Sequence, residues 1–276
     1  MTIQDAIRQG TRQLEAAGVP DPRLDAEYLL AGVLNQPRLS VCLNKMEPLL
    51  SEAWEAFDSL LRRRATREPL QYILGETPFY GRSFKCDRRA LIPRPETELL
   101  CELAIAAMPP QGQVLDLCCG TGAIGLTLAL ECPGSRVTLT DLSSDALALA
   151  HENAQRLGAD CSFYQGDLFA AVPEKRFHLI VSNPPYIPAA VCEGLQEEVL
   201  KEPLMALDGG ADGLNFYRRI ALEAPVHLLP GGWLMLEIGY DQGETVPTLL
   251  EERFTQIQLH HDLNRLPRMV TAQLKP

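Results

Sequence analysis

From residue 112 onward, short apolar runs alternate with helical stretches, and this alternation is the feature that most restricts the fold. The apolar runs have the length of buried strands and lie at 114–117, 137–139, 177–181 and 233–238. The stretches with helical spacing lie at 123–131, 145–157, 214–227 and 242–253. Such alternation predicts an α/β fold with a doubly wound, mostly parallel sheet. Two last strands, near 255–260 and 269–274, are separated only by a loop and should form an antiparallel edge.

The region before this alternation has the pattern of a small helical bundle. Apolar side chains recur at helical spacing in 3–17, 24–34 and 50–66. Two short β-type runs around Gly81-Arg82 then predict a hairpin. We therefore expect three parts in the chain: an N-terminal helical domain that recognises the substrate at 1–75, a hairpin linker at 76–92 and an α/β domain at 93–276.

The net charge of −11 is concentrated in the α/β domain. Residues 1–92 hold 13 basic and 12 acidic side chains, whereas residues 93–276 hold 12 basic and 24 acidic ones. Because phosphate is repelled by an acidic surface, this excess disfavours tight binding of nucleic acid by the α/β domain. It leaves small molecules, cations and proteins as ligands.

The cysteines and the apolar runs bear on the compartment. The eight cysteines are scattered, and no pair has the spacing of a zinc site, so we expect free thiols and no metal. No apolar run has the length of a membrane span, and the first residues lack the pattern of a signal peptide. We therefore expect a cytoplasmic protein without a membrane partner.

A glycine turn follows the first strand of the α/β domain. The strand at 114–117 runs into Cys118-Cys119-Gly120-Thr121-Gly122 and then into a helix. Glycines let a ligand approach the backbone, and the start of a helix offers unpaired N–H groups. The spacing matches neither the dinucleotide-binding nor the phosphate-binding glycine motif. The turn therefore predicts a nucleoside-type site without a grip on phosphates.

Acidic residues mark the carboxyl ends of three predicted strands. Asp116 lies in the first strand, Asp141 ends the second, and Asp167 follows a further strand, the third along the chain, which ends at Gln165. Because ligands of open α/β sheets bind beyond these strand ends, we expect the three acids to converge on one crevice, with Asp141 accepting from ribose hydroxyls. Acids around a nucleoside suit a ligand with a positive charge. The alternative is a tight turn with capping acids and no ligand.

A rigid polar loop, Asn183-Pro184-Pro185-Tyr186, follows the fourth strand. The prolines restrict the backbone, so the Asn183 side-chain oxygen and a nearby carbonyl form two fixed acceptors. Two acceptors can hold both N–H bonds of a planar –NH₂ group, and the Tyr186 ring can stack on its face. Held in this way, a weakly nucleophilic amide or aryl amine is positioned for attack on an electrophile. The alternative is a structural Pro-Pro turn.

Together, these residues resemble the class I S-adenosylmethionine-dependent methyltransferases. Asn183-Pro184-Pro185-Tyr186 is similar to the loop of the branch that methylates adenine amines or glutamine amides. The runs at 69–75 and at 91–98, which contains Ile92-Pro93-Arg94-Pro95-Glu96-Thr97-Glu98, are similar to the protein-(glutamine-N5) methyltransferases of bacterial peptide-chain release factors. Cys119 is a departure from the usual glycine turn and could alter how closely the methionine part of the donor approaches.

The resemblance implies a methyltransferase domain at 93–276, S-adenosylmethionine as the methyl donor and a release factor as the protein substrate. The residues expected at the donor are Asp116, Cys118, Cys119, Gly120, Thr121, Gly122, Asp141, Leu142, Asp167, Leu168 and Asn183. The glutamine would be held by Asn183, Pro184, Pro185 and Tyr186, of which Asn183, Pro184 and Tyr186 are the expected catalytic residues.

Other functions remain open at this stage. They are an adenine-N6 methyltransferase of RNA or DNA, which the acidic α/β domain disfavours, a glutamine methyltransferase of a ribosomal protein, and a non-catalytic ligand-binding module on the same fold. Arg62, Arg63, Arg64 and Arg67 form either a docking patch or a solvated helical face. Arg94 and Glu98 either take a direct part in the site or belong to a helix start that acids stabilise.

Overall fold

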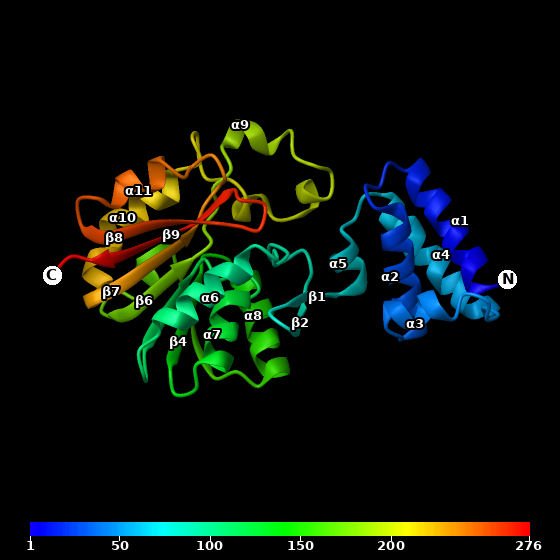
Figure 1. The fold of residues 1–276 in the computed structure, drawn as a ribbon, viewed down its shortest axis with the longest axis horizontal. Coiled ribbons are helices and arrows are strands. Elements are labelled where there is room, and N and C mark those ends of the chain that lie inside the picture. Colours follow the sequence, from blue (N-terminus) through cyan, green and yellow to red (C-terminus); the bar gives the residue numbers. More distant parts are fainter. The chain divides into compact units, whose positions relative to one another are not determined.

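The computed structural model describes all 276 residues, and they form two compact units (Figure 1). Unit 1 consists of Met1–Glu76 together with Gln196–Lys201, and unit 2 consists of Thr77–Leu195 and Glu202–Pro276. None of the helices combines the length and the apolar character that a membrane span requires.

Unit 1 is a helical bundle, as its apolar spacing predicts. The three expected helices are α1 (Ile3–Ala16), α2 (Pro22–Leu34) and α4 (Ser51–Ala65), and two short ones not predicted are α3 (Arg38–Leu43) and α5 (Leu70–Leu74). Helix α1 begins at a capping box, in which the Thr2 hydroxyl accepts from the Asp5 N–H and the Asp5 carboxylate accepts from the Thr2 N–H. The core is made of fully buried side chains, among them Leu14, Leu29, Leu30, Phe57 and Leu61.

A segment from much later in the chain, Gln196–Lys201, belongs to unit 1, and we call it the strap. Arg64, whose side chain is only 5% exposed, donates from Nε to Asp25 Oδ2 and from Nη2 to Glu198 Oε1, each at 2.7 Å. Arg67 binds both oxygens of Glu198, at 2.7 and 2.6 Å. A buried guanidinium with two carboxylate partners is a strong anchor, because charge-assisted hydrogen bonds gain strength where water is excluded.

These contacts fit neither of the two interpretations of the arginine cluster as a whole. Arg64 and Arg67 hold the strap, while Arg62 pairs with Asp58 and Arg63 with Glu68. The cluster is therefore neither a free docking patch nor a uniformly solvated face. Glu198 lies more than a hundred residues away in sequence, which is why no local pattern predicts this role.

We expect Glu198→Ala to release the strap, because Arg64 and Arg67 lose their shared carboxylate. Trypsin should then cleave after Lys201 faster than in the unchanged protein under native conditions. The matched control is Glu197→Ala, since the Glu197 side chain is 65% exposed and reaches Arg67 only at 3.8 Å. Equal cleavage rates in the two variants would contradict the anchoring role of Glu198.

Unit 2 contains a seven-stranded sheet with the order β5-β4-β3-β6-β7-β9-β8. Strands β3 to β7 pair in parallel, and β9 pairs antiparallel with both β7 and β8, which confirms the mostly parallel α/β fold and its antiparallel edge. The strands are β3 (Gln113–Leu117), β4 (Arg136–Asp141), β5 (Cys161–Gln165), β6 (Phe177–Ser182), β7 (Leu228–Glu237), β8 (Phe254–His261) and β9 (Pro267–Leu274).

Helices cover both faces of this sheet (Figure 1). One face carries α6 (Thr97–Ala107), α7 (Ala123–Glu131) and α8 (Ser144–Leu157), and the other carries α10 (Asn215–His227) and α11 (Thr245–Leu250). The connections also contain α9 (Ala189–Cys192) and the short 3₁₀ helices η1 (Leu168–Ala171), η2 (Val199–Lys201) and η3 (Leu204–Ala206). Each face of the sheet has its own apolar core, so the strands are buried on both sides.

A two-stranded sheet, β1 (Glu76–Phe79) with β2 (Arg82–Lys85), confirms the predicted hairpin. Phe79 and Phe84 are buried and meet edge to face, with their ring centroids 5.8 Å apart, in the core beneath α6 and α7. At the hairpin turn, the Glu98 carboxylate accepts from the Tyr80 N–H at 2.8 Å. Glu98 therefore ties the hairpin to the start of α6.

Candidate functional site

A cavity of about 460 Å³ opens at the carboxyl ends of the parallel strands of unit 2. Strands β4 and β5 lie on one side of β3, and β6 and β7 lie on the other, so the chain reverses its direction of winding between β3 and β6. Such a switch point leaves a crevice that open α/β sheets use for ligands. Of the residues expected at the site, the wall includes Cys118, Cys119, Gly120, Thr121, Asp141, Leu142, Asp167, Leu168, Asn183 and Pro185.

The glycine turn after β3 has a left-handed backbone at three positions. The φ angles are 62° at Cys118, 54° at Gly120 and 79° at Gly122, and Gly122 caps α7 from behind the wall. A Cβ at Gly120 would meet nothing closer than Ala90 Cβ at 3.9 Å, so the turn leaves open space there. A non-glycine residue in this conformation costs about 1 kcal/mol, and the strain at Cys118 is of a kind that gathers at ligand sites.

Asp141 fastens this turn to the end of β4. Its Oδ2 accepts from the Gly120 N–H and its Oδ1 from the Ser143 N–H, both at 2.9 Å. Burial raises the pKa of Asp141, while these N–H bonds act in the opposite direction. Because each carboxylate oxygen has two lone pairs, both can still accept from a ligand in the cavity.

Asp116 differs from its two companions, because its side chain is fully buried away from the cavity. Its Oδ2 accepts from the Gly125 N–H at 2.7 Å, under the first turn of α7, and its Oδ1 has no partner. Burial raises the pKa of Asp116 to about 7. Asp116 precedes the last residue of β3, so its carboxylate lies under α7 instead of on the crevice rim where the sequence placed it.

We expect Asp116→Asn to change how stability depends on pH. The raised pKa means that protonated Asp116 stabilises the fold fully below pH 3.8, and that this contribution is lost as the pH rises to about 7. Asparagine does not titrate and can still accept from Gly125. The free energy of unfolding of the variant minus that of the unchanged protein should therefore increase across this range, by up to about 4 kcal/mol, and then level off. Urea unfolding of both proteins at a series of pH values measures this difference in the free energy of unfolding. A difference that does not change with pH would contradict the raised pKa of Asp116.

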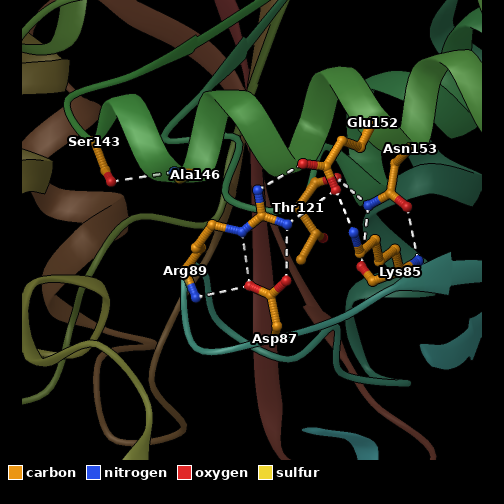
Figure 2. Close-up of polar contacts among 8 residues, drawn as sticks. All are labelled: Lys85, Asp87, Arg89, Thr121, Ser143, Ala146, Glu152 and Asn153. Atoms are coloured by element: carbon orange, nitrogen blue, oxygen red, sulfur yellow. Dashed lines mark hydrogen bonds and ion pairs between the residues drawn. The ribbon is translucent and has the colours of Figure 1, made fainter. Parts of the chain in front are cut away.

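Basic side chains on the cavity wall are already paired. Arg89 donates to Asp87 and to Glu152, as Figure 2 shows, and its guanidinium uses Nε, Nη1 and Nη2 in these bonds. Arg94 pairs with Glu202, whose side chain is only 2% exposed. Both wall arginines therefore already have carboxylate partners.

Acidic side chains on the wall outnumber these bases. Asp167 pairs with Arg219 at 2.9 Å, whereas Asp141 and Asp208 form no ion pair and accept from backbone N–H groups. Asp208 was not predicted from the sequence, because it follows no strand. The cavity therefore carries an excess of negative charge, which favours a cationic ligand.

A buried asparagine on α8 holds the glycine turn against the hairpin (Figure 2). Asn153 Oδ1 accepts from the Lys85 N–H at 2.7 Å, and its Nδ2 donates to the carbonyls of Thr121, at 3.0 Å, and Lys85, at 3.1 Å. The side chain thus uses both ends of its amide on main-chain groups. A polar residue on the apolar face of the predicted helix is the only sequence signal that marks it.

Some residues of the loop after β6 line the cavity, and others pack against the core. Asn183 and Pro185 lie on the cavity wall, whereas Pro184 and Tyr186 do not. The Tyr186 side chain packs against the core beside α10 and α11, and burial raises its pKa to about 12. The structure therefore brings Asn183 to the cavity but does not place the Tyr186 ring on the wall.

The carbonyl of Tyr186 is enclosed by residues that the sequence did not single out. It accepts from Gln242 Nε2 at 3.0 Å, and a Cβ at Gly213 would stand only 2.3 Å from it. Only glycine fits at position 213, because any side chain would displace the carbonyl.

We expect Gly213→Ala to lower the melting temperature far more than Gly158→Ala. Both glycines have left-handed backbones, with φ of 75° and 72°, so both variants incur a conformational cost of about 1–2 kcal/mol. A Cβ at Gly158 meets nothing within 4 Å, whereas a Cβ at Gly213 would clash with the Tyr186 carbonyl and also stand 2.9 Å from Gln242 Nε2. Similar melting temperatures for the two variants would show that the loop tolerates the displacement.

The run at 91–98 carries polar side chains that bind other segments of unit 2, and two of them, Arg94 and Thr97, also line the cavity wall. Arg94 and the Ile92 N–H both bind Glu202, the latter at 2.9 Å. Thr97 donates from Oγ1 to Glu237 Oε2 at 2.6 Å. With Glu98 on the hairpin turn, these contacts show that the run is more than a helix start, because each side chain holds a different segment of unit 2.

Known proteins match both parts of the chain. Residues 5–75 match the family described as PrmC N-terminal domain, and residues 96–211 match the methyltransferase small domain. A release factor glutamine methyltransferase of Geobacter sulfurreducens is 42% identical over 99% of this chain and 97% of that protein. The corresponding protein of Cereibacter sphaeroides is 45% identical over 99% of both chains. A solved methyltransferase from Pyrococcus furiosus, 16% identical, covers 71% of this chain and 91% of its own with a TM-score of 0.55, which shows a shared fold.

Proposed function

This chain belongs to the family of release factor glutamine methyltransferases, and we propose that it transfers a methyl group from S-adenosylmethionine to the side-chain amide nitrogen, N5, of a glutamine in a peptide-chain release factor. The single observation that carries the proposal is a relative of this name that matches the chain from end to end at 45% identity. Release factors act at the ribosome, so we also propose that the protein works in the cytoplasm.

The cavity has the properties that S-adenosylmethionine requires. Its volume of about 460 Å³ lies within the usual range for small-molecule sites. The open turn at Gly120 lets a ligand approach the backbone, and Asp141 offers free lone pairs to ribose hydroxyls. The unpaired carboxylates of Asp141 and Asp208 complement a positive charge. When bound, this donor supplies a methyl group on a positively charged sulfur.

We assign donor contacts to the residues of the sequence-predicted set that lie on the wall. They are Cys118, Cys119, Gly120, Thr121, Asp141, Leu142, Asp167, Leu168 and Asn183. Asp116 and Gly122 would act from behind the wall, by supporting the start of α7. Cys119 is compatible with this assignment, because its small, largely buried side chain forms part of the wall.

The proposed role of the loop after β6 is to hold the substrate amide. Asn183 Oδ1 would accept one N–H bond of the glutamine side chain, and a backbone carbonyl of the same loop would accept the other. Both acceptors grow stronger as positive charge develops on the nitrogen, so they favour the transition state over the ground state. Pro185 would shape the wall beside the amide, and Tyr186 would hold the loop in place from the core instead of stacking on the substrate.

The protein substrate is preferred over a nucleobase on electrostatic grounds. Part of the negative charge of the α/β domain lies on the cavity wall itself, at Asp141 and Asp208. The phosphates of a nucleic acid would have to approach this wall and would be repelled. We therefore propose no direct nucleic-acid partner. A ribosomal protein substrate would meet the same wall, so the experiment below includes it.

The test incubates the purified protein with S-adenosylmethionine and, separately, with a bacterial release factor, total ribosomal protein, or RNA and DNA. We expect one added methyl group on a glutamine of the release factor, read by peptide mass spectrometry. Asn183→Ala should lower kcat by about 100-fold or more, since it removes an acceptor that acts in the transition state, with a much smaller change in donor Kd.

Asn264→Ala serves as the matched control, because Asn264 is exposed on the loop between β8 and β9 and its side chain makes no hydrogen bond. It should leave both constants unchanged. Methyl transfer to nucleic acid or ribosomal protein, with none to the release factor, would overturn the proposal. Equal losses of turnover and donor binding in Asn183→Ala would argue against the loop as a substrate clamp.

A further inference from the structure

Three polar side chains from distant parts of unit 2 meet at the cavity: Thr97 and Asn183 line its wall, and the buried Glu237 contacts Thr97. Strands β6 and β7 pair in parallel with Ser182 opposite Leu236, so the residues that follow, Asn183 and Glu237, lie next to each other. Thr97, the first residue of α6, reaches both of them. Its Oγ1 lies 2.6 Å from Glu237 Oε2 and 3.5 Å from Asn183 Nδ2.

While Glu237 is ionised, the protons of this chain of contacts have only one consistent arrangement. An ionised carboxylate can only accept, so Glu237 takes the single hydroxyl proton of Thr97. The Thr97 oxygen then has only lone pairs left to offer, and the neighbouring end of the Asn183 amide must be its –NH₂ group. Asn183 Oδ1 is thereby turned away from Thr97, and it accepts no hydrogen bond from the protein.

This arrangement matters because the two ends of an asparagine amide have nearly the same shape. If the amide of Asn183 rotated by half a turn, it would present N–H donors to a substrate group that itself only donates. The acceptor needed for a glutamine –NH₂ would be lost without any visible change in packing. Something must therefore select one orientation, and sterics alone cannot.

We propose that Thr97 and Glu237 are positioning residues that hold the Asn183 amide with its oxygen free for the substrate nitrogen, an inference that rests on the proposed function. Thr97 acts directly on Asn183, and Glu237 acts through Thr97. Thr97 therefore contributes to the reaction, in addition to its place at the start of α6.

The surroundings of Glu237 hold its carboxylate in place as the acceptor of the Thr97 hydroxyl. Its side chain is fully buried, and its backbone carbonyl accepts from the Tyr217 hydroxyl at 2.8 Å, which anchors the end of β7. Burial raises the pKa of Glu237 to about 7, while the Thr97 hydrogen bond and the charges of Arg268 and Arg94 act in the opposite direction. At pH 8 the carboxylate is therefore mostly ionised, and the experiment is set at that pH.

The test compares Thr97→Val with Thr97→Ser in the full-length protein, using S-adenosylmethionine and a release factor. Valine keeps the shape of threonine but has no hydroxyl, and serine keeps the hydroxyl. We expect Thr97→Val to lower kcat by about tenfold or more, because the acceptor is then correctly oriented in only part of the population and positioning errors are costly. The KM for the release factor and the Kd for the donor should stay within about twofold. Thr97→Ser should restore most of the turnover.

The outcomes separate this inference from the proposed function. If the unchanged protein transfers no methyl group, the proposed function fails. If the unchanged protein is active and Thr97→Val has the same kcat, or if Thr97→Ser is as slow as Thr97→Val, the positioning role is wrong. A loss confined to donor Kd would likewise overturn it, since it would mean that Thr97 only shapes the cavity wall.

A second variant covers the case in which Thr97→Val does not fold because Glu237 loses its partner. Glu237→Gln has the same shape and no charge, and its amide can donate to Thr97, which frees the Thr97 proton for Asn183 Oδ1. The selection of one orientation is then weakened, and kcat should fall by about threefold or more at constant donor Kd. An unchanged kcat in this variant would contradict the role of Glu237.

Discussion

The parallel register of β4, β3, β6 and β7 is the constraint on which the rest of the molecule depends. Parallel strands end on the same edge of a sheet, so whatever follows each strand is brought to one place. The glycine turn follows β3, Asp141 ends β4, Asn183 follows β6 and Glu237 ends β7. Helices on both faces bury the strands, and this burial fixes the register on which every distance in the site relies.

Charge in the catalytic unit is arranged by pairing. Each basic side chain on the cavity wall already has carboxylate partners, as Arg89 has in Asp87 and Glu152. The carboxylates without such partners, Asp141 and Asp208, accept only backbone N–H groups. The wall therefore repels phosphate and attracts a cation, although residues 93–276 contain 12 basic side chains. For ligand binding, the net charge of the cavity wall matters more than the net charge of the whole α/β domain.

The regular elements could be predicted because their signals are local. The strand and helix alternation, the hairpin and the antiparallel edge all follow from spacing within a few residues. The missed contacts join residues far apart in sequence. Glu198 to Arg64 spans 134 positions, and Thr97 to Glu237 spans 140. Asp116 shows the converse, because its place in the sequence suggested a ligand contact, while its side chain lies beneath α7.

By itself, the sequence determined the class of fold, the order of its main elements and the strand-end segments that border the cavity, because strand ends, glycine turns and prolines act through the local backbone. Only the tertiary structure decided which of those residues face the cavity and which hold others in place. It buried Asp116 beneath α7, packed Tyr186 against the core and brought Thr97 and Glu237 next to Asn183. The reason is physical: the direction of a side chain and its hydrogen-bond partners depend on neighbouring strands and helices. Local sequence patterns do not specify these neighbours, because they come from distant parts of the sequence.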